Sequence, residues 1–271
     1  MQFYVLLWLV APIPRKSLLE EQKYRTLAKD GSVTEQSLPC WLDTWTSTKR
    51  EKKIRHGGPM EAAELFMSVV VPAYNEEDRL AGMLEEAVNY LERMYGTLHE
   101  DNHQRTTRQR KPAAAREAAA ADERGWEILI VSDGSKDQTE EMALRFARDH
   151  QLSLHPKGHA GPWTPKPQEG VSIPPGAIRV VSLAQNRGKG GAVTHGLRHV
   201  RGQYVVFADA DGATKFDDLG KLVAACQQIQ DSQARAVAVG SRAHMVGSEA
   251  VVKVSSSQPP PLLKQSDEQA I

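Results

Sequence analysis

Short apolar runs alternate with helical patterns through the middle of this 271-residue chain, and this alternation limits its possible folds more than any other feature. The runs are almost continuously apolar, as strands are when both faces of a sheet are buried. Between them, apolar residues recur at the spacing of one helix face. We therefore expect an α/β fold with a mostly parallel, Rossmann-like sheet flanked by helices. The expected strands are Met67–Pro72, Trp126–Val131, Ile178–Leu183, Tyr204–Ala208 and Ala236–Gly240, and the expected helices are Asp78–Tyr95, Gln138–His150, Ala192–Val200 and Phe216–Ile229.

Polar motifs directly follow four of these strands. In sheets of this kind ligands bind outside the carboxyl ends of the strands, so motifs at those ends meet at one edge. One such motif is common in turns, but four at the same edge indicate a ligand site. The motifs are Tyr74-Asn-Glu-Glu77, Ser132-Asp-Gly-Ser135, Asn186-Arg-Gly-Lys-Gly-Gly191 and Asp209-Ala-Asp211.

Asp209 and Asp211 place two carboxylates, spaced two residues apart, at the end of the fourth run. Side chains two apart in a strand point the same way. Paired carboxylates offer hard oxygen ligands to Mg²⁺ or Mn²⁺ and leave positions for the phosphates of a substrate. The pair therefore favours an enzyme that acts on a phosphorylated substrate. The alternative is an ordinary Asp-Gly turn after a strand.

Asp133 and the glycines of the third motif each have a functional and a structural interpretation. Asp133 can accept hydrogen bonds from a base or a ribose, or it can belong to a turn before a helix. Gly188, Gly190 and Gly191 permit close approach of phosphate to a helix N-terminus, and Lys189 adds a positive charge. A tight helix entry is the alternative. The spacing is neither a P-loop nor G-x-G-x-x-G, so it indicates neither an ATPase nor a dehydrogenase.

Three further residues at this edge are candidates for ligand contacts. Tyr74 can stack on a base, and Glu76 can contact a base or act in catalysis. Arg242, after the fifth strand, can clamp a phosphate. Helix capping is the alternative for Glu76, and a plain surface position is the alternative for Arg242.

The composition argues against several classes of protein. Lys plus Arg and Asp plus Glu both number 34, so the formal net charge is zero and no overall field attracts nucleic acid. Cys40 and Cys226 are far apart in the sequence, and the nine histidines show no paired spacing. We therefore expect no nucleic-acid partner, no disulfide framework and no Cys/His metal site.

The two ends of the chain differ from its middle. Residues 1–65 are expected to form an N-terminal segment whose apolar stretch, Phe3–Val10, is shorter than the ~20 residues of a membrane span. We interpret that stretch as the stump of an anchor; a buried or disordered tail is the alternative. Residues 66–244 are expected to form the globular domain, with insertions at 99–124 and 155–176. Residues 245–271 have the composition of a disordered tail.

The motifs resemble those of the family 2 glycosyltransferases with a GT-A fold. Within that family, the glycine loop and the aspartate motif are similar to those of the subgroup that glucosylates dolichyl phosphate. The resemblance runs from about Met67 to His244. It rests on Val69-Val-Val-Pro-Ala-Tyr-Asn-Glu-Glu77, Ser132-Asp-Gly-Ser-Lys-Asp-Gln-Thr139, Asn186-Arg-Gly-Lys-Gly-Gly-Ala192, Ala208-Asp-Ala-Asp-Gly-Ala-Thr-Lys-Phe216 and Gly240-Ser-Arg-Ala-His244.

This resemblance implies an inverting enzyme that moves glucose from UDP-glucose to dolichyl phosphate for protein N-glycosylation. It implies association with the endoplasmic reticulum membrane at its cytosolic face. Asp209 and Asp211 are implied as the catalytic and metal-binding pair, which would hold Mg²⁺ or Mn²⁺. The implied donor-binding residues are Pro72, Tyr74, Glu76, Asp133, Lys189, Asp209, Ala210, Asp211 and Arg242.

The chain departs from the family pattern at two places. Ser132 stands where the family usually has an aspartate, and the family's chain continues well beyond the motif that contains Arg242. We therefore expect a C-terminally truncated enzyme in which donor binding can survive the loss of turnover. The alternatives are a dolichyl-phosphate mannosyltransferase-like enzyme and a non-catalytic nucleotide-sugar-binding fragment, with a nucleotidyltransferase more distant.

Overall fold

A computed structural model of the chain describes residues 17–51, 62–96, 125–151, 173–213, 215–231 and 235–240. The chain divides into two compact units, Met1–Leu219 and Gly220–Ile271. The expected anchor stump, the insertion at 99–124 and the tail at 245–271 lie outside the described residues. Among the residues that are described, no helix is long and apolar enough to cross a bilayer.

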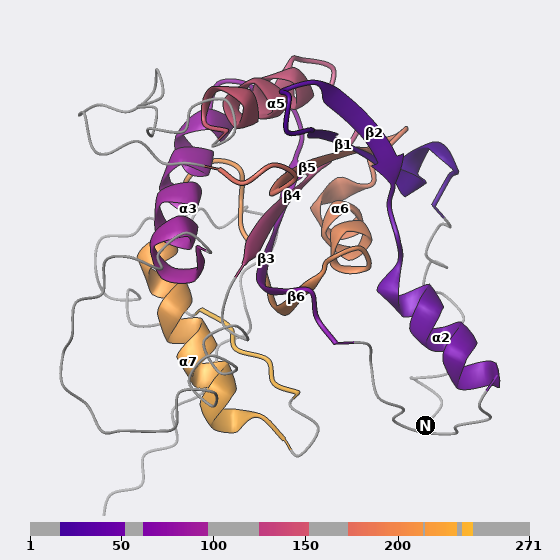
Figure 1. Cartoon of the computed structure of the whole chain (residues 1–271), viewed down its shortest axis with the longest axis vertical. Helices are drawn as coiled ribbons and strands as arrows, with labels where there is room; N and C mark the ends of the chain where they lie inside the picture. The colour runs from indigo at the N-terminus through magenta and orange to yellow at the C-terminus, as the bar shows by residue number, and fades with distance from the viewer. Residues whose placement is uncertain are drawn as a thin grey trace, which may run out of the picture. The chain divides into compact units, whose positions relative to one another are not determined.

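A six-stranded sheet forms the centre of the first unit (Figure 1). Strands β3, β4, β5 and β6 run parallel, whereas β1 is antiparallel to both β2 and β5. The expected α/β fold with a mostly parallel sheet is therefore confirmed. Across the sheet the order is β2 (Val33–Ser37), β1 (Lys23–Leu27), β5 (Ile178–Ser182), β4 (Trp126–Ser132), β3 (Leu65–Ala73) and β6 (Gly202–Phe207).

Helices cover both faces of this sheet (Figure 1). On one face α6 (Gly188–Leu197) packs against β3 and β4, and on the other lie α3 (Leu80–Tyr95) and α5 (Thr139–Asp149). The core beneath α6 consists of side chains that alternate along the central strands, as period-2 geometry requires. Its fully buried members are Leu38, Val70, Leu129, Val131, Val181, Leu183 and Ala192.

The segment before β3 forms structure that the sequence analysis did not predict. A short turn, η1 (Glu20–Gln22), leads into the β1–β2 hairpin, and α2 (Trp41–Glu51) follows. The indole Nε1 of Trp41 donates to the carbonyl of Leu197 at 2.7 Å, which ties the start of α2 to the end of α6. The sequence did hold a signal for the hairpin, because Asp30-Gly31 lies between two β-prone stretches.

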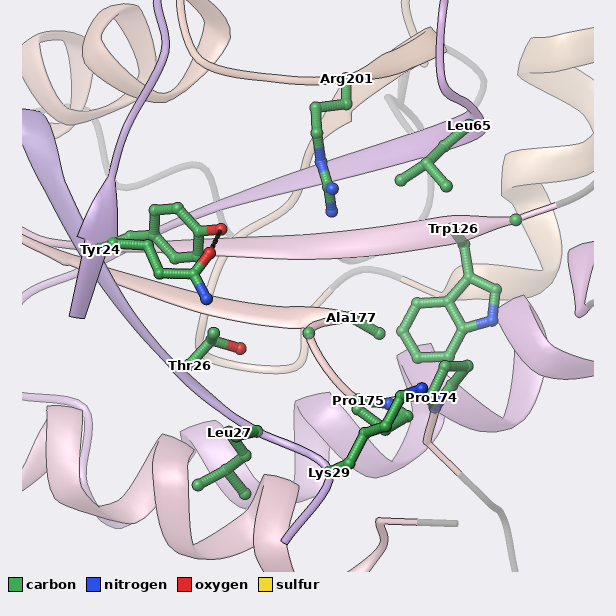
Figure 2. Close-up of a pocket in the computed structure, with 14 residues that line it drawn as sticks. Tyr24, Thr26, Leu27, Lys29, Leu65, Trp126, Pro174, Pro175, Ala177 and Arg201 are labelled. Atoms are coloured by element: carbon green, nitrogen blue, oxygen red, sulfur yellow. Dashed lines mark hydrogen bonds between the residues drawn. The ribbon is translucent and has the colours of Figure 1, made fainter. Parts of the chain in front are cut away.

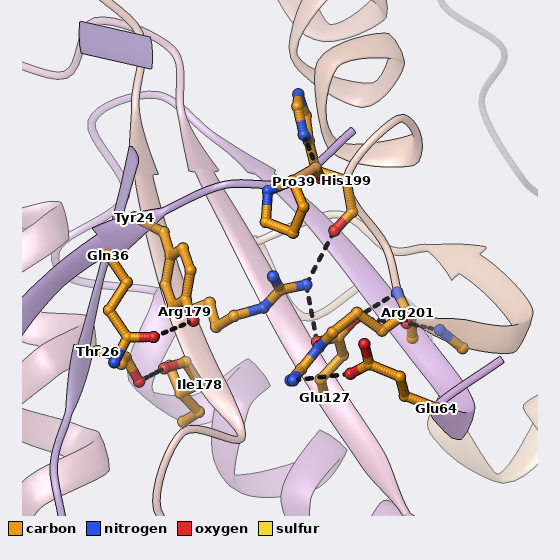
Figure 3. Close-up of polar contacts among 12 residues, drawn as sticks. Tyr24, Thr26, Gln36, Pro39, Glu64, Glu127, Ile178, Arg179, His199 and Arg201 are labelled. Atoms are coloured by element: carbon orange, nitrogen blue, oxygen red, sulfur yellow. Dashed lines mark hydrogen bonds and ion pairs between the residues drawn. The ribbon is translucent and has the colours of Figure 1, made fainter. Parts of the chain in front are cut away.

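A buried ionic network joins the strands near their amino ends (Figure 3). The Glu127 carboxylate on β4 is fully buried and accepts Ser68 Oγ at 2.6 Å and Arg201 Nε at 2.8 Å. Arg179 Nη2 on β5 lies 2.7 Å from the same carboxylate and donates to the carbonyl of His199 at 3.0 Å. The network links three strands to the connection between α6 and β6.

The expected strand at Ala236–Gly240 is wrong. Residues 235–240 form no strand in the described part of the chain, and the side chains of Val237 and Val239 are 81% and 82% exposed. Alternating Ala and Val match the composition of a strand, but a strand also needs a neighbour for its backbone hydrogen bonds. In the second unit, the Arg235 guanidinium instead pairs with Asp231 at 2.7 Å.

Two smaller corrections concern the last elements. The expectation that every strand is buried on both faces is wrong for β6, an edge strand on which Val205 and Phe207 are exposed. The expected helix at Phe216–Ile229 is instead a short turn, η2 (Phe216–Asp218), followed by α7 (Leu219–Ile229). The expected loop at 155–176 is described only from Ile173, which forms a parallel bridge with Gln151.

Candidate active site

One cavity of about 320 Å³ lies at the carboxyl ends of β3, β4 and β6. All the predicted donor-binding residues that the structure describes line this cavity, which brings together four motifs far apart in the sequence. Arg242 lies outside the described residues. The lining residues are Pro72, Ala73, Tyr74, Glu76, Asp133, Asn186, Gly188, Lys189, Ala192, Asp209, Ala210 and Asp211.

The loops after β3 and β4 are joined by reciprocal hydrogen bonds. Asn75, with a positive φ of 55°, accepts the Lys136 N–H at its side-chain oxygen at 2.8 Å. The Glu76 N–H donates to Thr139 Oγ1 at 2.8 Å. In return, the Gln138 N–H donates to the Glu77 carboxylate at 2.7 Å. These bonds hold the first two motifs as one unit beside the cavity.

Tyr74 and Glu76 occupy different environments within the first motif. Tyr74 lines the cavity with 45% of its surface exposed, so its ring is accessible to a planar ligand. The Glu76 carboxylate lies 2.7 Å from Arg79 Nη2, just before α3. Glu76 therefore lines the cavity and pairs with Arg79, whereas the helix cap expected as its alternative does not form, because no side chain caps the start of α3.

Asp133 is buried at the floor of the cavity. Its Oδ1 accepts the N–H of Arg187 at 2.7 Å, which connects the loop after β4 to the loop after β5. Gly134 makes this approach possible, because it has a φ of 73° and an added Cβ would lie 2.9 Å from the N of Asn186. An L side chain at that position would separate the two loops.

Ser132 does not line the cavity. It is the last residue of β4, and its fully buried hydroxyl has no hydrogen-bond partner in the part of the chain that the structure describes. Alternation along the strand directs Ser132 and Asp133 to opposite sides. The departure from the family pattern at Ser132 therefore lies behind the cavity wall.

Lys189, Asp209 and Asp211 form the charged side of the cavity. Lys189 Nζ lies 2.5 Å from Asp209 Oδ1, and both side chains are partly exposed. Asp211 Oδ1 accepts the N–H of Ala213 at 2.9 Å. Because Asp209 and Asp211 line one cavity, their carboxylates can supply two oxygen ligands to a divalent cation, which Mg²⁺ sites commonly complete with substrate phosphates.

The start of α6 supplies a further anion-binding feature. The helix begins at Gly188, four residues before the expected start at Ala192, and Gly188 has a φ of 72°. Its glycine-rich first turn exposes backbone N–H groups beside the cavity, where the helix dipole favours negative charge. The glycines therefore belong to the helix itself, and the expected start of the helix at Ala192 was wrong.

Two residues that matter to this region escaped the sequence analysis. Asn186 lines the cavity, and its side-chain oxygen accepts the Gly188 N–H at 2.9 Å. Glu21, which lies 166 residues before Arg187 in the sequence, forms an ion pair with it. Asn186 stood within a recognised motif, whereas no local signal in the sequence linked Glu21 to it.

A second cavity, of about 410 Å³, opens at the other edge of the sheet (Figure 2). Leu65, Trp126 and Ala177 line it at the amino ends of β3, β4 and β5. Figure 2 shows Tyr24 and Trp126 on opposite sides, with the Arg201 side chain directed between them. None of the predicted site residues lines this second cavity.

Comparisons with known proteins agree with the motifs. The chain is 33% identical over 261 residues to the dolichyl-phosphate beta-glucosyltransferase of Saccharomyces cerevisiae, covering 94% of this chain and 60% of the yeast protein. It is 34% identical to the protein of that name in Drosophila melanogaster, over 68% of this chain and 43% of the fly protein. The human protein of that name is 35% identical, over 66% of this chain and 41% of its own length.

The chain thus spans less than two thirds of the length of these curated relatives. Among solved structures, Staphylococcus aureus TarS 1–349 matches 60% of this chain and 33% of its own, at 17% identity and a TM-score of 0.33. That likeness is too distant to transfer a ligand. The sequence model described as Glycosyl transferase family 2 matches residues 68–160 and 164–255, more than half of the chain. The chain therefore belongs to glycosyl transferase family 2.

Proposed function

We propose that this chain carries the donor site of an inverting glucosyltransferase that moves glucose from UDP-glucose to dolichyl phosphate. The observation that supports this most directly is the single cavity lined by eight predicted donor-binding residues from four separated motifs. Relatives named dolichyl-phosphate beta-glucosyltransferase support the choice of sugar and acceptor.

The uridine half of the donor would lie over the joined loops of β3 and β4. Tyr74 offers an accessible ring for stacking on the base, and Pro72 lines the same cavity. The Asp133 carboxylate keeps acceptor capacity beyond its bond to Arg187, so it can accept from the base or the ribose. Glu76 completes this side of the cavity.

The diphosphate would lie between the start of α6 and the two aspartates. The first turn of α6 brings backbone N–H groups to this position, and Lys189 brings a positive charge. Asp209 and Asp211 would hold Mg²⁺ or Mn²⁺, which when bound neutralises the charge on the leaving diphosphate. Lys189 and the cation would compete for Asp209, so we expect the lysine to move to a phosphate when the donor binds.

The acceptor needs little activation by the protein. A phosphate monoester has its second pKa near 6 and is already anionic at neutral pH. One of its oxygens can attack the anomeric carbon as the bond from that carbon to the UDP oxygen breaks. UDP leaves with the electron pair, and the configuration inverts. Arg242 is proposed to contact phosphate or donor.

We further propose that the protein works in N-glycosylation, associated with the endoplasmic reticulum membrane at its cytosolic face. The acceptor is a membrane lipid, whereas the sugar nucleotide is water-soluble, so the site must face water at a membrane surface. We propose residues 66–244 as the glycosyltransferase domain, to whose sheet the β1–β2 hairpin of the N-terminal segment 1–65 adds two strands, the apolar stretch Phe3–Val10 as a membrane anchor, and 245–271 as a tail.

A transfer assay with the purified chain tests the proposal. Radiolabelled UDP-glucose, dolichyl phosphate in detergent and Mn²⁺ are expected to give lipid-linked glucose, and chelation of the metal is expected to abolish it. Asp209→Asn and Asp211→Asn should each lower the rate about 100-fold or more, since each removes a carboxylate ligand of the cation that would neutralise the leaving diphosphate. The matched control is Asp217→Asn, because Asp217 is exposed and pairs with Arg93 away from the cavity.

Three outcomes separate this function from its alternatives. Transfer of mannose from GDP-mannose without transfer of glucose from UDP-glucose would indicate a mannosyltransferase-like enzyme. Metal-dependent UDP binding without any transfer would indicate a nucleotide-sugar-binding fragment. Equal losses of transfer rate in Asp217→Asn and Asp209→Asn would contradict the assignment of Asp209 and Asp211 as the metal-binding pair.

A further inference from the structure

Glu21 is a buried carboxylate that reaches the donor-site loop from the N-terminal segment. Its side chain is fully buried. Its Oε2 accepts the Leu18 N–H at 2.6 Å, and its Oε1 accepts the Ala184 N–H at 3.2 Å. The guanidinium of Arg187 donates to the same carboxylate. Two of the three donors thus belong to the loop between β5 and α6.

The sheet register explains this meeting. β1 pairs antiparallel with β5, with Arg25 opposite Val180. In an antiparallel pair, each step back along one strand is a step forward along the other. Continuing the register by four residues therefore sets Glu21 opposite Ala184, where the bond from the Ala184 N–H is found.

Arg187 connects Glu21 to the cavity. Its side chain bonds Glu21, while its backbone N–H donates to Asp133 Oδ1 at 2.7 Å. Gly191 leaves room for this arrangement, because an added Cβ there would lie 2.5 Å from the Arg187 Cβ. Lys189, two residues further on, faces Asp209. A shift of Arg187 would therefore move two cavity residues together.

The electrostatics agree with an ionised pair. Burial alone would raise the pKa of Glu21, but the N–H groups of Leu18 and Ala184 and the Arg187 guanidinium outweigh it and hold that pKa below 4.5. The Arg187 side chain is only 12% exposed. Without Glu21, its charge would lie buried with no ionic partner among the described residues, which favours movement toward water.

We propose that Glu21 is a positioning residue for the donor site, whose carboxylate acts through Arg187 to hold residues 184–191 in place. The turn η1 before the hairpin thus contributes to the site although none of its residues lines the cavity. The identity of the ligand rests on the proposed function, whereas the positioning itself does not.

Hydrogen exchange tests the positioning without any ligand. In Glu21→Gln, which keeps the shape and removes the charge, peptides covering residues 184–191 should exchange about 10-fold faster than in the wild type. The matched control is Glu20→Gln, which changes the exposed neighbour in the same turn and should leave exchange unchanged. Unchanged exchange in Glu21→Gln would overturn the proposal.

Kinetics distinguish positioning from simple loss of folded protein. Glu21→Gln should raise the KM for UDP-glucose about 10-fold, with a smaller change in kcat, whereas loss of folded enzyme lowers apparent kcat and leaves KM unchanged. If Glu21 acts through Arg187, adding Glu21→Gln to Arg187→Met should change UDP affinity less than about twofold. Additive effects would contradict that route.

The two proposals fail in different ways. A wild-type chain that does not bind UDP with Mn²⁺ would refute the proposed donor, while the exchange comparison would still decide the role of Glu21. Equal rates of glucose transfer by the wild type and by Glu21→Gln would refute the positioning role and leave the proposed function in place.

Discussion

His195 on α6 is a buried imidazole held neutral by its surroundings. Burial is the first cause that lowers its pKa to about 4, and the neighbouring His199 and the Arg187 guanidinium lower it further. The two imidazole rings lie 4.7 Å apart between centroids. Glu21 acts in the opposite direction but is outweighed. Protonation of His195 therefore opposes folding.

We predict a loss of stability in mild acid that depends on His195. Its ordinary pKa is 6.5 and its folded pKa is about 4, so the unfolded chain binds the extra proton first. The contribution of the neutral His195 to the free energy of unfolding is fully present above pH 6.5. It falls as the pH drops toward 4, by roughly 2 to 3 kcal/mol at pH 4.5. Urea unfolding at pH 7.5 and pH 4.5 measures this fall.

The comparison with His195→Gln isolates the effect. Other groups, His199 among them, titrate in both proteins, so the readout is the difference between variant and wild type. The free energy of unfolding of His195→Gln minus that of the wild type should become more positive as the pH falls from 7.5 to 4.5. An equal loss of stability in both proteins would contradict the prediction.

At the level of single elements, α6 is positioned by the lack of a side chain at Gly196. An added Cβ there would lie 2.4 Å from Val70 Cγ1 and 3.1 Å from Val131 Cγ2. The helix therefore lies directly on β3 and β4, and this contact places its N-terminus at the cavity.

We predict that Gly196→Ala destabilises the first unit despite the better helix propensity of alanine. Overpacking against two buried strands should cost about 1 to 3 kcal/mol. The matched control is Gly82→Ala on α3, where no atom lies within 4 Å of the added Cβ, and a gain of up to about 1 kcal/mol is expected. Unfolding in urea checks both; a neutral Gly196→Ala would show that α6 can shift without loss.

The elements also differ in how far the sequence predicted them. The expected central strands form within one or two residues, because almost continuous apolar runs have few alternatives inside a domain. The β1–β2 hairpin was missed because β2 is largely exposed and polar. The run at Ala236–Gly240 was wrongly expected to be a strand, since local composition does not provide a pairing partner.

At the level of the first unit, the Glu127 network fixes how the strands are joined. Its carboxylate receives donors from β3, from β5 and from Arg201, which precedes β6. A buried carboxylate with several partners tolerates few other arrangements of the chain around it.

We predict that Glu127→Gln destabilises the first unit by about 3 to 5 kcal/mol, because the buried Arg179 loses its ionic partner. Glu64→Gln serves as the control: Glu64 pairs with the same Arg201, at 3.4 Å, but is largely exposed, so its loss should cost less than about 1 kcal/mol. Urea unfolding again measures both. Equal effects would mean that burial does not decide the strength of this network.

The sequence by itself determined the α/β fold and placed the donor motifs, because apolar runs and turn residues act locally and parallel strands bring their carboxyl ends to one edge. Eight predicted residues accordingly line one cavity. Only the tertiary structure decided that Ser132 lies behind that cavity and that Glu21 holds Arg187. The first depends on which face of β4 each side chain occupies, and the second on the β1–β5 register across more than 150 residues of sequence. Alternation along β4 separates Ser132 from Asp133 but does not tell which of the two faces the cavity, and local patterns carry nothing of the register between distant strands.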